Sequence, residues 1–202
     1  MKLKFKKINE DWLDDLEDSS LDAEIENNRL FTNPEQEFSS KDTSIRQVPA
    51  LHKDMAKRNM WKEKSVNLDY GGGRYDDASD FVHALDLGVK NLVYDAFNRD
   101  EKHNRRVENF LIHNGGADSV TCANVLNVIK EPSVRNSVIE NIYYFLKDGC
   151  TAYFTVYDSG QEKETSKGYQ LGKKLSFYVP EVASVFGDDN VTTKYGMIIA
   201  RK

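Results

Sequence analysis

Three consecutive glycines set between carboxylates are the part of this sequence best suited to chemistry. Residues 65–77 read Ser-Val-Asn-Leu-Asp-Tyr-Gly-Gly-Gly-Arg-Tyr-Asp-Asp, and residues 91–95, Asn-Leu-Val-Tyr-Asp, end about 20 positions after the glycines. Each short apolar run closes on an acid, Asp69 or Asp95, as a strand does where it enters a turn of an open α/β sheet. Ligands bind at that edge, glycines let backbone approach them closely, and an acid at this spacing meets ribose hydroxyls. These residues predict a site for a nucleoside-containing cofactor.

The charges around the glycines bear on which cofactor fits. A dinucleotide site presents bare N–H groups to a pyrophosphate and has Gly or Ala at the third fingerprint position, where this chain has Asp76. Asp69, Asp76 and Asp77 would surround the phosphates with negative charge, which only Arg74 opposes. A cofactor with an ammonium, a sulfonium and a ribose but no phosphate would be attracted instead, and S-adenosyl-L-methionine fits that description. The alternative is a structural turn in which Asp76 or Asp77 only caps the next helix.

Hydrophobic periodicity predicts strands that alternate with helices. Helical spacing is found in residues 78–88, 101–114, 132–148 and 177–186, and short apolar runs fill residues 66–69, 91–95, 117–122 and 150–157. Residues 191–201 are expected to hold one or two closing strands around Gly196. Residues 42–60 predict a further helix that packs over the glycine turn. It is capped by Asp42, Thr43 or Ser44, and Pro49 either lies near its first turn or forces a second start. This alternation predicts an open α/β sheet with helices on both faces.

Polar side chains near the carboxyl ends of the later strands are candidates for contact with a substrate. As a hydrogen-bond partner or base for an acceptor, the candidates are Asn127, Tyr157 and Tyr169. The candidates for substrate binding are Gln47, Gln170 and Lys173. Residues 158–174 form a long polar loop at the end of the fourth predicted strand, where loops usually make the substrate side of a site. The alternative is a solvated loop and, for Gln47, a plain packing helix.

Length and composition limit the class of protein. The 202 residues suffice for one α/β domain with a proper core and are too few for two domains with linkers. The sequence has no apolar run long enough to span a bilayer and no signal-peptide pattern, so we expect a cytoplasmic protein without a membrane partner. The two cysteines, Cys122 and Cys150, are expected near opposite ends of neighbouring strands, where they cannot form a disulfide.

The charge of the chain is unevenly distributed. The formal net charge is −5, yet residues 1–8 hold four lysines and residues 9–37 hold eleven acids and one arginine. We expect an acidic N-terminal arm over residues 1–41, flexible or dependent on a partner, and a folded domain over residues 42–202. The arm is either a solvated tail or an acidic surface that docks a basic protein or mimics nucleic acid. The remaining chain is almost neutral, which gives no electrostatic reason to expect nucleic acid.

Several runs of residues resemble motifs of class I S-adenosylmethionine-dependent methyltransferases. Residues 67–73, Asn-Leu-Asp-Tyr-Gly-Gly-Gly, are similar to the first motif of that family, and Asp95 falls where its ribose-binding acid falls. Residues 124–126, Asn-Val-Leu, look like its fourth motif, and residues 146–149, Leu-Lys-Asp-Gly, look like its usual turn before a strand.

The resemblance runs from about Ser44 to the end of the sequence. The amino-acid sequences of residues 44–51 and 117–129 look most similar to those of small methyltransferases of phages and mobile elements. The resemblance implies a Rossmann-like, doubly wound, mostly parallel sheet. Only about 20 residues separate Asp95 from the next predicted strand, which leaves little room for the family's usual third strand with its adenine-contacting acid. A sheet that lacks one strand of the usual seven is therefore compatible with the sequence.

The resemblance also implies which residues bind S-adenosyl-L-methionine. Asp69 and the glycines would face the methionine part, together with Asn124 at its far end. Asp95 would face the ribose. The adenine would lie against the two residues that follow Asp95. The cofactor-binding residues expected in this way are Asp69, Tyr70, Gly71, Gly73, Asp95, Ala96, Phe97 and Asn124.

The activity implied by the resemblance is transfer of the sulfonium methyl to an acceptor. Because the methyl is already activated, the main task of the protein is to hold the acceptor in line with it. The Asn-Pro-Pro-Tyr and Asp-Pro-Pro-Tyr motifs of amino-group DNA methyltransferases are absent, so the acceptor stays open among small molecules, proteins and nucleic acids. If the chain is phage-encoded, its place is the host cytoplasm. Two alternatives are a non-catalytic protein that binds the cofactor or a host protein through the acidic arm, and a nicotinamide-dependent oxidoreductase.

Overall fold

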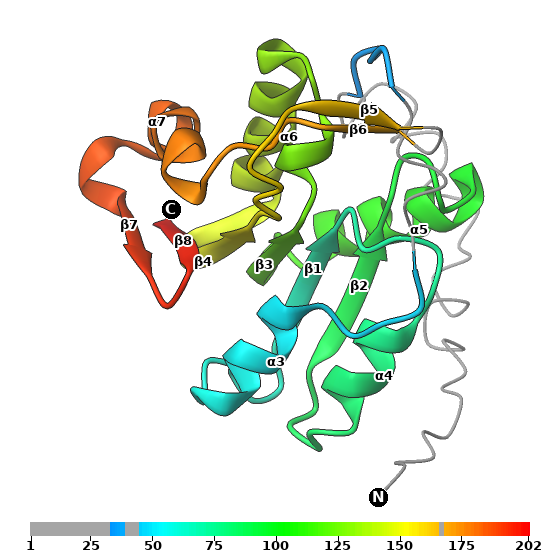
Figure 1. Cartoon of the computed structure of the whole chain (residues 1–202). Helices are drawn as coiled ribbons and strands as arrows, with labels where there is room; N and C mark the ends of the chain where they lie inside the picture. The colour runs from blue at the N-terminus through cyan, green and yellow to red at the C-terminus, as the bar shows by residue number, and fades with distance from the viewer. Residues whose placement is uncertain (1–32, 39–44, 166–167) are drawn as a thin grey trace, which may run out of the picture.

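A six-stranded, mostly parallel sheet forms the centre of the fold, with the strand order β2-β1-β3-β4-β8-β7 (Figure 1). The structure is a computed structural model that describes residues 33–38, 45–165 and 168–202. The strands of this sheet are β1 (Val66–Tyr70), β2 (Lys90–Tyr94), β3 (Ala117–Ala123), β4 (Leu146–Thr155), β7 (Val191–Lys194) and β8 (Met197–Arg201). Neighbours among β1 to β4 are parallel, and β8 is antiparallel to both β4 and β7. A short hairpin of β5 (Lys163–Thr165) and β6 (Gly168–Gln170) stands apart from the sheet.

Helices cover both faces of the sheet, as the alternation of the sequence predicts. On one face, α3 (Ala50–Lys57) and α4 (Asp77–His83) bury Leu51, Met55 and Val82 together with Trp61 and Met197. On the other face lie α5 (Glu101–His113), α6 (Pro132–Phe145) and α7 (Leu175–Phe186), which share the larger core. The described residues also form two short 3-10 helices, η1 (Leu126–Val128) and η2 (Asp188–Asn190). In the part of the chain that the structure describes, no helix has the length and apolarity that crossing a bilayer requires.

The helix before β1 is shorter than the sequence pattern predicts. Of the predicted range 42–60, α3 covers Ala50–Lys57, which confirms the alternative in which Pro49 forces a new start. The proposed cap residues 42–44 lie outside the described residues. Pro49 precedes the helix in an extended conformation, with φ −57° and ψ 147°. Because proline has no N–H and restricts the residue before it to extended backbone, the helix starts after Pro49. Gln47 therefore lies in the segment that leads into the helix.

The outer edge of β2 is covered by side chains of α5 instead of another strand. Among the described residues, no strand lies beyond β2, and α5 follows β2 directly (Figure 1). His103 Nε2 lies 2.7 Å from the Val93 carbonyl oxygen, which can only accept a hydrogen bond. The side-chain amide of Asn104 accepts from the Asp95 N–H at 3.2 Å and donates to the Asp95 carbonyl at 3.0 Å. These three backbone groups are thus satisfied where an extra strand would otherwise satisfy them.

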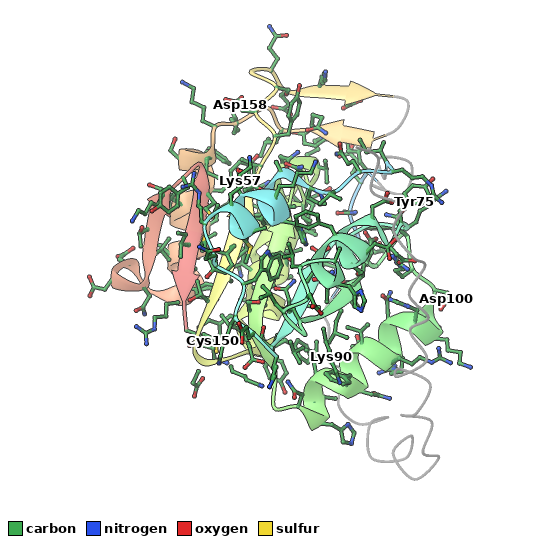
Figure 2. All side chains as sticks on the ribbon, turned by 90° about the horizontal axis from the view of Figure 1, so that it is seen from below. Lys57, Tyr75, Lys90, Asp100, Cys150 and Asp158 are labelled. Carbon is green, nitrogen blue, oxygen red and sulfur yellow. The ribbon has the colours of Figure 1, made fainter. Side chains whose placement is uncertain are left out.

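The two cysteines are free and apart, which confirms the sequence-based expectation that they form no disulfide. Cys122 lies near the carboxyl end of β3, where its register partner in β4 is Phe154. Cys150 lies toward the amino-terminal edge of the sheet, on the same side as Lys90 at the start of β2 and far from Asp158 (Figure 2).

Candidate functional site

The glycine turn after β1 folds back onto the end of β2. Gly71 and Gly73 have φ values of 72° and 79°, a left-handed conformation that glycine adopts without strain. The N–H groups of Gly71 and Gly72 donate to the Tyr94 carbonyl at 2.7 and 3.4 Å. The N–H of Gly73 donates to Asp95 Oδ2 at 2.9 Å. All three glycine N–H groups are used within the protein, so the turn does not offer the bare donors that a pyrophosphate requires.

Asp95 organises the loop that follows β2. Its side chain is buried, and Oδ1 accepts from the N–H groups of Phe97 and Asn98, each at 2.9 Å. The side-chain amide of Asn98 adds a third bond to Oδ1 at 3.1 Å. Among the described residues, only Gly73 donates to Oδ2, which can still accept from a ligand hydroxyl. The carboxylate is therefore fixed in place and has one acceptor position left.

Asp69 is buried beneath the turn with one carboxylate oxygen unpaired. The residue is 1% exposed, and Oδ1 accepts from the Thr121 hydroxyl at 2.9 Å. Oδ2 has no hydrogen-bond partner, although His52 Nε2 lies 3.4 Å away. His52 is fully buried in α3, and its Nδ1 also lacks a partner. Because an unpaired buried acceptor is costly, this oxygen suits a donor or a cation supplied by a ligand.

A row of buried polar side chains behind Asp69 holds it in position. Along β1, the apolar residues face one side of the sheet, and Asn67 and Asp69 face the other. Asn67 Nδ2 donates to Thr121 Oγ1 at 3.0 Å and to Asn91 Oδ1 at 2.7 Å. The hydroxyl of Ser119 donates to Asn67 Oδ1 at 2.7 Å. Each strand from β1 to β3 contributes to this row, so the geometry around Asp69 follows from the register of the sheet.

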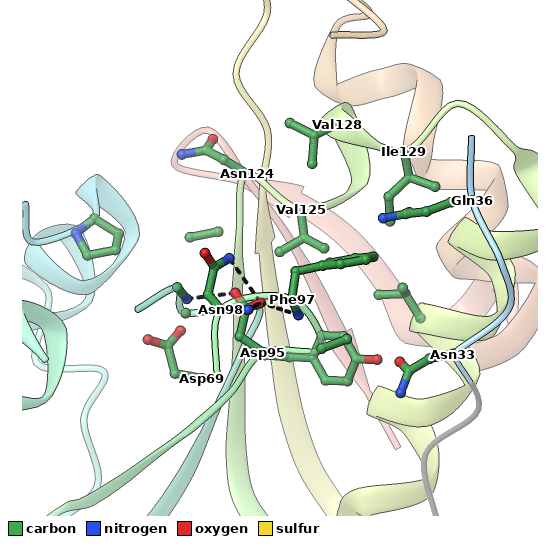
Figure 3. Close-up of a pocket in the computed structure, with 18 of the residues that line it drawn as sticks. Asn33, Gln36, Asp69, Asp95, Phe97, Asn98, Asn124, Val125, Val128 and Ile129 are labelled. Atoms are coloured by element: carbon green, nitrogen blue, oxygen red, sulfur yellow. Dashed lines mark hydrogen bonds between the residues drawn. The ribbon is translucent and has the colours of Figure 1, made fainter. Parts of the chain in front are cut away.

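These groups line a cavity of about 190 Å³ at the carboxyl ends of β1, β2 and β3. Asp69 lies toward one end of the cavity, Asn33 and Gln36 lie toward the other, and Asp95 lies between them (Figure 3). The apolar part of the lining consists of Pro34, Ile45, Pro49, Ala96, Phe97, Ala123, Val125, Val128, Ile129, Val134 and Val138. An elongated cavity of this kind can hold a ligand with a charged end and a flat apolar end.

The electrostatic character of the cavity is negative. Among the described residues that line it, Asp69 and Asp95 are acidic and none is basic. The nearby Arg99 donates to Asp76 Oδ1 at 2.6 Å and to the Gly73 carbonyl at 2.8 Å, but it does not line the cavity. A ligand with positive charge is favoured at such a site, and an anionic one is disfavoured. The described residues hold no group of three or more side chains suited to bind a metal ion.

The cavity brings together all eight residues expected to bind the cofactor, which are Asp69, Tyr70, Gly71, Gly73, Asp95, Ala96, Phe97 and Asn124. Gln47, expected to bind substrate, lines it as well. A Cβ on Gly71 would overlap the side chain of Val125, so the close approach of the turn to the loop after β3 requires glycine here. The binding roles themselves stay predictions.

The other polar candidates lie outside the cavity lining, and they are Asn127, Tyr157, Tyr169, Gln170 and Lys173. Asn127 is buried, and its amide donates to Gln170 Oε1 at 2.9 Å. Tyr169 donates to Glu162 Oε1 at 2.6 Å, and burial together with this carboxylate raises the pKa of its phenol. Tyr157 and Lys173 are exposed. The structure thus pairs Asn127 with Gln170 but does not place the five at one site, and their roles also stay predictions.

Residues 33–38, called the N-terminal strap below, form a wall of the cavity that the sequence did not single out. Asn33 Nδ2 donates to Tyr94 Oη at 2.6 Å, and burial raises the pKa of Tyr94 to about 12. Phe38 stacks on Tyr169 with ring centroids 5.3 Å apart. The strap belongs to the predicted arm, whose residues 1–32 and 39–41 lie outside the described residues. Its sequence, Asn-Pro-Glu-Gln-Glu-Phe, reads as more of the acidic segment, so no signal marked it as part of a site.

Of the comparisons with known proteins, only the one with solved structures finds similar proteins. No protein-family model matches the chain, and no curated protein sequence does. The chain is similar to PigF with SAH, at 14% identity over 75% of this chain and 56% of that one, with a TM-score of 0.49. Human N-acetylserotonin methyltransferase in complex with SAM gives 16% identity over 76% of this chain and 54% of that one, with a TM-score of 0.48. A S-adenosylmethionine-dependent methyltransferase from Clostridium acetobutylicum ATCC 824 gives 11% identity over 74% and 87%, with a TM-score of 0.45.

The chain thus spans little more than half the length of the first two of these proteins. Likenesses at this level assign no activity to it, and the function proposed below stands on the geometry of the cavity.

Proposed function

We propose that this chain is an S-adenosyl-L-methionine-dependent methyltransferase that binds its cofactor in the cavity at the carboxyl ends of β1, β2 and β3. The observation that carries the proposal is the pair of buried carboxylates in a cavity without a basic side chain among its described residues. At one end, Asp69 has a buried oxygen that accepts no hydrogen bond and lies 3.4 Å from His52 Nε2, and Asp95 keeps one acceptor position in the middle. The cofactor is a cation with an ammonium at one end and ribose hydroxyls in its middle, which both donate to carboxylates.

Each part of the cavity suits one part of this cofactor. The ammonium would donate to Asp69 Oδ2, and a ribose hydroxyl would donate to Asp95 Oδ2. The purine would lie at the far end, where Phe97, Val128 and Ile129 supply apolar surface (Figure 3). The glycine turn would lie along the methionine part because its lack of Cβ atoms permits close contact.

The hydrogen bonds of the glycine turn argue against the nicotinamide alternative. A dinucleotide needs free N–H groups at this turn and tolerates few carboxylates near its phosphates. Here the three glycine N–H groups are bound to Tyr94 and Asp95, and Asp69 lies directly below them. We therefore expect no measurable binding of NAD under conditions in which S-adenosylhomocysteine binds.

The chemistry supplied by bound S-adenosyl-L-methionine is an activated methyl on a sulfonium. In the transfer, an acceptor lone pair forms a bond to the methyl carbon, the C–S bond breaks and leaves a neutral thioether, and any acceptor proton passes to solvent or a base. The residues of this chain hold the cofactor, orient it and exclude water. Gln47 and Asn124 also line the cavity, and their side-chain amides would help to orient an acceptor. The acceptor itself is unassigned.

The origin of the chain forms part of the same proposal. The sequences of residues 44–51 and 117–129 resemble those of small methyltransferases of phages and mobile elements. This resemblance supports a phage-encoded protein that acts in the host cytoplasm.

The experiment that tests the proposal is a calorimetric titration of the full chain with S-adenosyl-L-methionine, S-adenosylhomocysteine and NAD. Binding of the first two without NAD supports it, and the absence of binding by both refutes it. Asp148→Asn serves as the control because Asp148 is 95% exposed and does not line the cavity. Transfer of labelled methyl from the cofactor to components of a cell extract then separates an enzyme from a protein that only binds the cofactor.

A further inference from the structure

The N-terminal strap closes the end of the cavity that lies opposite Asp69. Of the strap residues, Asn33, Pro34 and Gln36 line the cavity. Asn33 and Gln36 lie toward the same end as Val128 and Ile129 (Figure 3). Apolar walls of this kind favour a flat aromatic group, but the ring nitrogens of a purine lose their water there and need hydrogen-bond partners. A donor on the wall is therefore required for tight binding of a purine.

Gln36 has the free donor that such a base requires. Its Nε2 is buried and has no hydrogen-bond partner. The other polar groups of the strap are engaged or turned to solvent: Asn33 donates to Tyr94, Glu37 pairs with Lys130 at 2.7 Å, and Glu35 is exposed. A glutamine amide is also the side chain that matches an adenine edge, since it can donate to a ring nitrogen and accept from the exocyclic amine.

The strap is anchored well enough to hold this amide in place. The Glu37 N–H donates to Glu131 Oε1 at 2.9 Å, and the Lys130 ammonium lies 5.3 Å from the centre of the Phe38 ring. Phe38 in turn stacks on Tyr169 at an interplanar angle of 15°. Contacts on both sides of Gln36, at Asn33 and at Phe38, therefore fix its position over the cavity.

We infer that Gln36 recognises the purine of the bound nucleoside by donating a hydrogen bond from its Nε2–H to a ring nitrogen of the base. This inference rests on the proposed cofactor site and assigns its base specificity to a segment outside the α/β domain expected over residues 42–202. The strap would then be a part of the binding site, and the cavity would be incomplete without it.

The test is a calorimetric titration of the full chain with S-adenosylhomocysteine and with its 1-deaza, 3-deaza and 7-deaza analogues, each of which replaces one ring nitrogen with C–H. The wild type should bind one of the three analogues about tenfold more weakly than S-adenosylhomocysteine. Gln36→Met keeps the length of the side chain and removes the donor. This variant should bind S-adenosylhomocysteine about tenfold more weakly than the wild type, and should no longer distinguish it from that analogue.

Two further variants complete the experiment. Gln36→Glu keeps the shape of the side chain without the donor, and it should lose the same discrimination. Gln161→Met, a matched change at an exposed glutamine outside the cavity lining, should keep it. Thermal unfolding of each variant checks that the fold is retained.

Equal binding of all four ligands by the wild type, or discrimination that survives in Gln36→Met, would overturn the inference and leave the proposed function intact. Failure of the wild type to bind S-adenosylhomocysteine at all would overturn both.

Discussion

The substitution Asp69→Asn tests the most specific feature of the site, the unpaired carboxylate oxygen in the cavity. The introduced side-chain amide would keep an oxygen where Oδ1 accepts from Thr121 at 2.9 Å, and would place an NH₂ group where Oδ2 now lacks a partner. Oδ2 has no hydrogen bond to lose, but the substitution also changes its contact with the buried His52 Nε2 at 3.4 Å, so the free energy of unfolding should fall by about 1 kcal/mol. The negative charge that faces the cavity would be lost, and an N–H would point at the ligand ammonium.

The size of the effect on binding can be estimated from this geometry. A hydrogen bond to a charged group contributes about 1.5–3 kcal/mol, and about 1.4 kcal/mol corresponds to tenfold in affinity. The Coulomb energy of an ion pair at about 4 Å near a protein surface, about 4 kcal/mol, sets an upper limit. Asp69→Asn should therefore weaken S-adenosylhomocysteine binding by roughly 10-fold to 100-fold.

The assay is a calorimetric titration of wild type and variant with two ligands. S-adenosylhomocysteine carries the ammonium, and 5′-methylthioadenosine lacks the whole amino-acid end. The variant should lose affinity for the first ligand and bind the second as the wild type does. Equal weakening for both would mean that Asp69 shapes the cavity instead of binding the ammonium, and unchanged affinity for both would refute the electrostatic reasoning. Asp148→Asn controls for the change in net charge, since Asp148 is 95% exposed.

Three other changes test contacts elsewhere in the fold. Asn104→Ala removes the amide that brackets the Asp95 backbone, and should weaken S-adenosylhomocysteine binding about tenfold by calorimetry; unchanged affinity would show that the loop holds Asp95 without it. Burial alone would raise the pKa of Asp118, but hydrogen bonds from a backbone N–H and from Lys147 lower this pKa below its usual value. The stabilisation by this carboxylate is therefore present above its unfolded pKa of about 3.9 and lost as the pH falls through the lower folded pKa. In urea unfolding, Asp118→Asn should cost about 1 kcal/mol at about pH 7 and much less at about pH 2, and a constant difference would contradict this account. Burial above all raises the pKa of the Cys122 thiol, so peptide mass spectrometry should find it unmodified by thiol reagents until the protein unfolds.

The central site could be predicted from the sequence because its determinants are local. Asp69 lies at the end of β1 just before the glycine turn, and Asp95 directly follows β2, so both must lie at the same edge of a parallel sheet. The register of β1 and β2 then brings the two strand ends together regardless of what covers them. For the same reason, the loop residues Phe97 and Asn124, which follow the strands on either side of β1, line the same cavity.

The rest of the site depends on contacts between segments that are distant in the chain. The strap reaches the cavity through Asn33 on Tyr94 and Phe38 on Tyr169, and neither pair leaves a periodic signal in the sequence. Likewise, Asn127 follows β3 at the expected edge, but its side chain turns to Gln170. The ends of the strands fix the position of the backbone that follows them. The direction in which each side chain of that backbone points depends on its packing.

Asp95 shows how the edge of the sheet and the cavity depend on one another. β2 has a strand neighbour on one side only, among the residues that the structure describes, so its outer backbone groups need other partners. A further strand would satisfy them through its own backbone, whatever its side chains. Here His103 and Asn104 do so through their side chains, and Asn104 holds the backbone of the residue whose carboxylate faces the cavity. The identity of residues on the covering helix α5 thus matters for the site, because the same amide that completes the sheet also fixes Asp95.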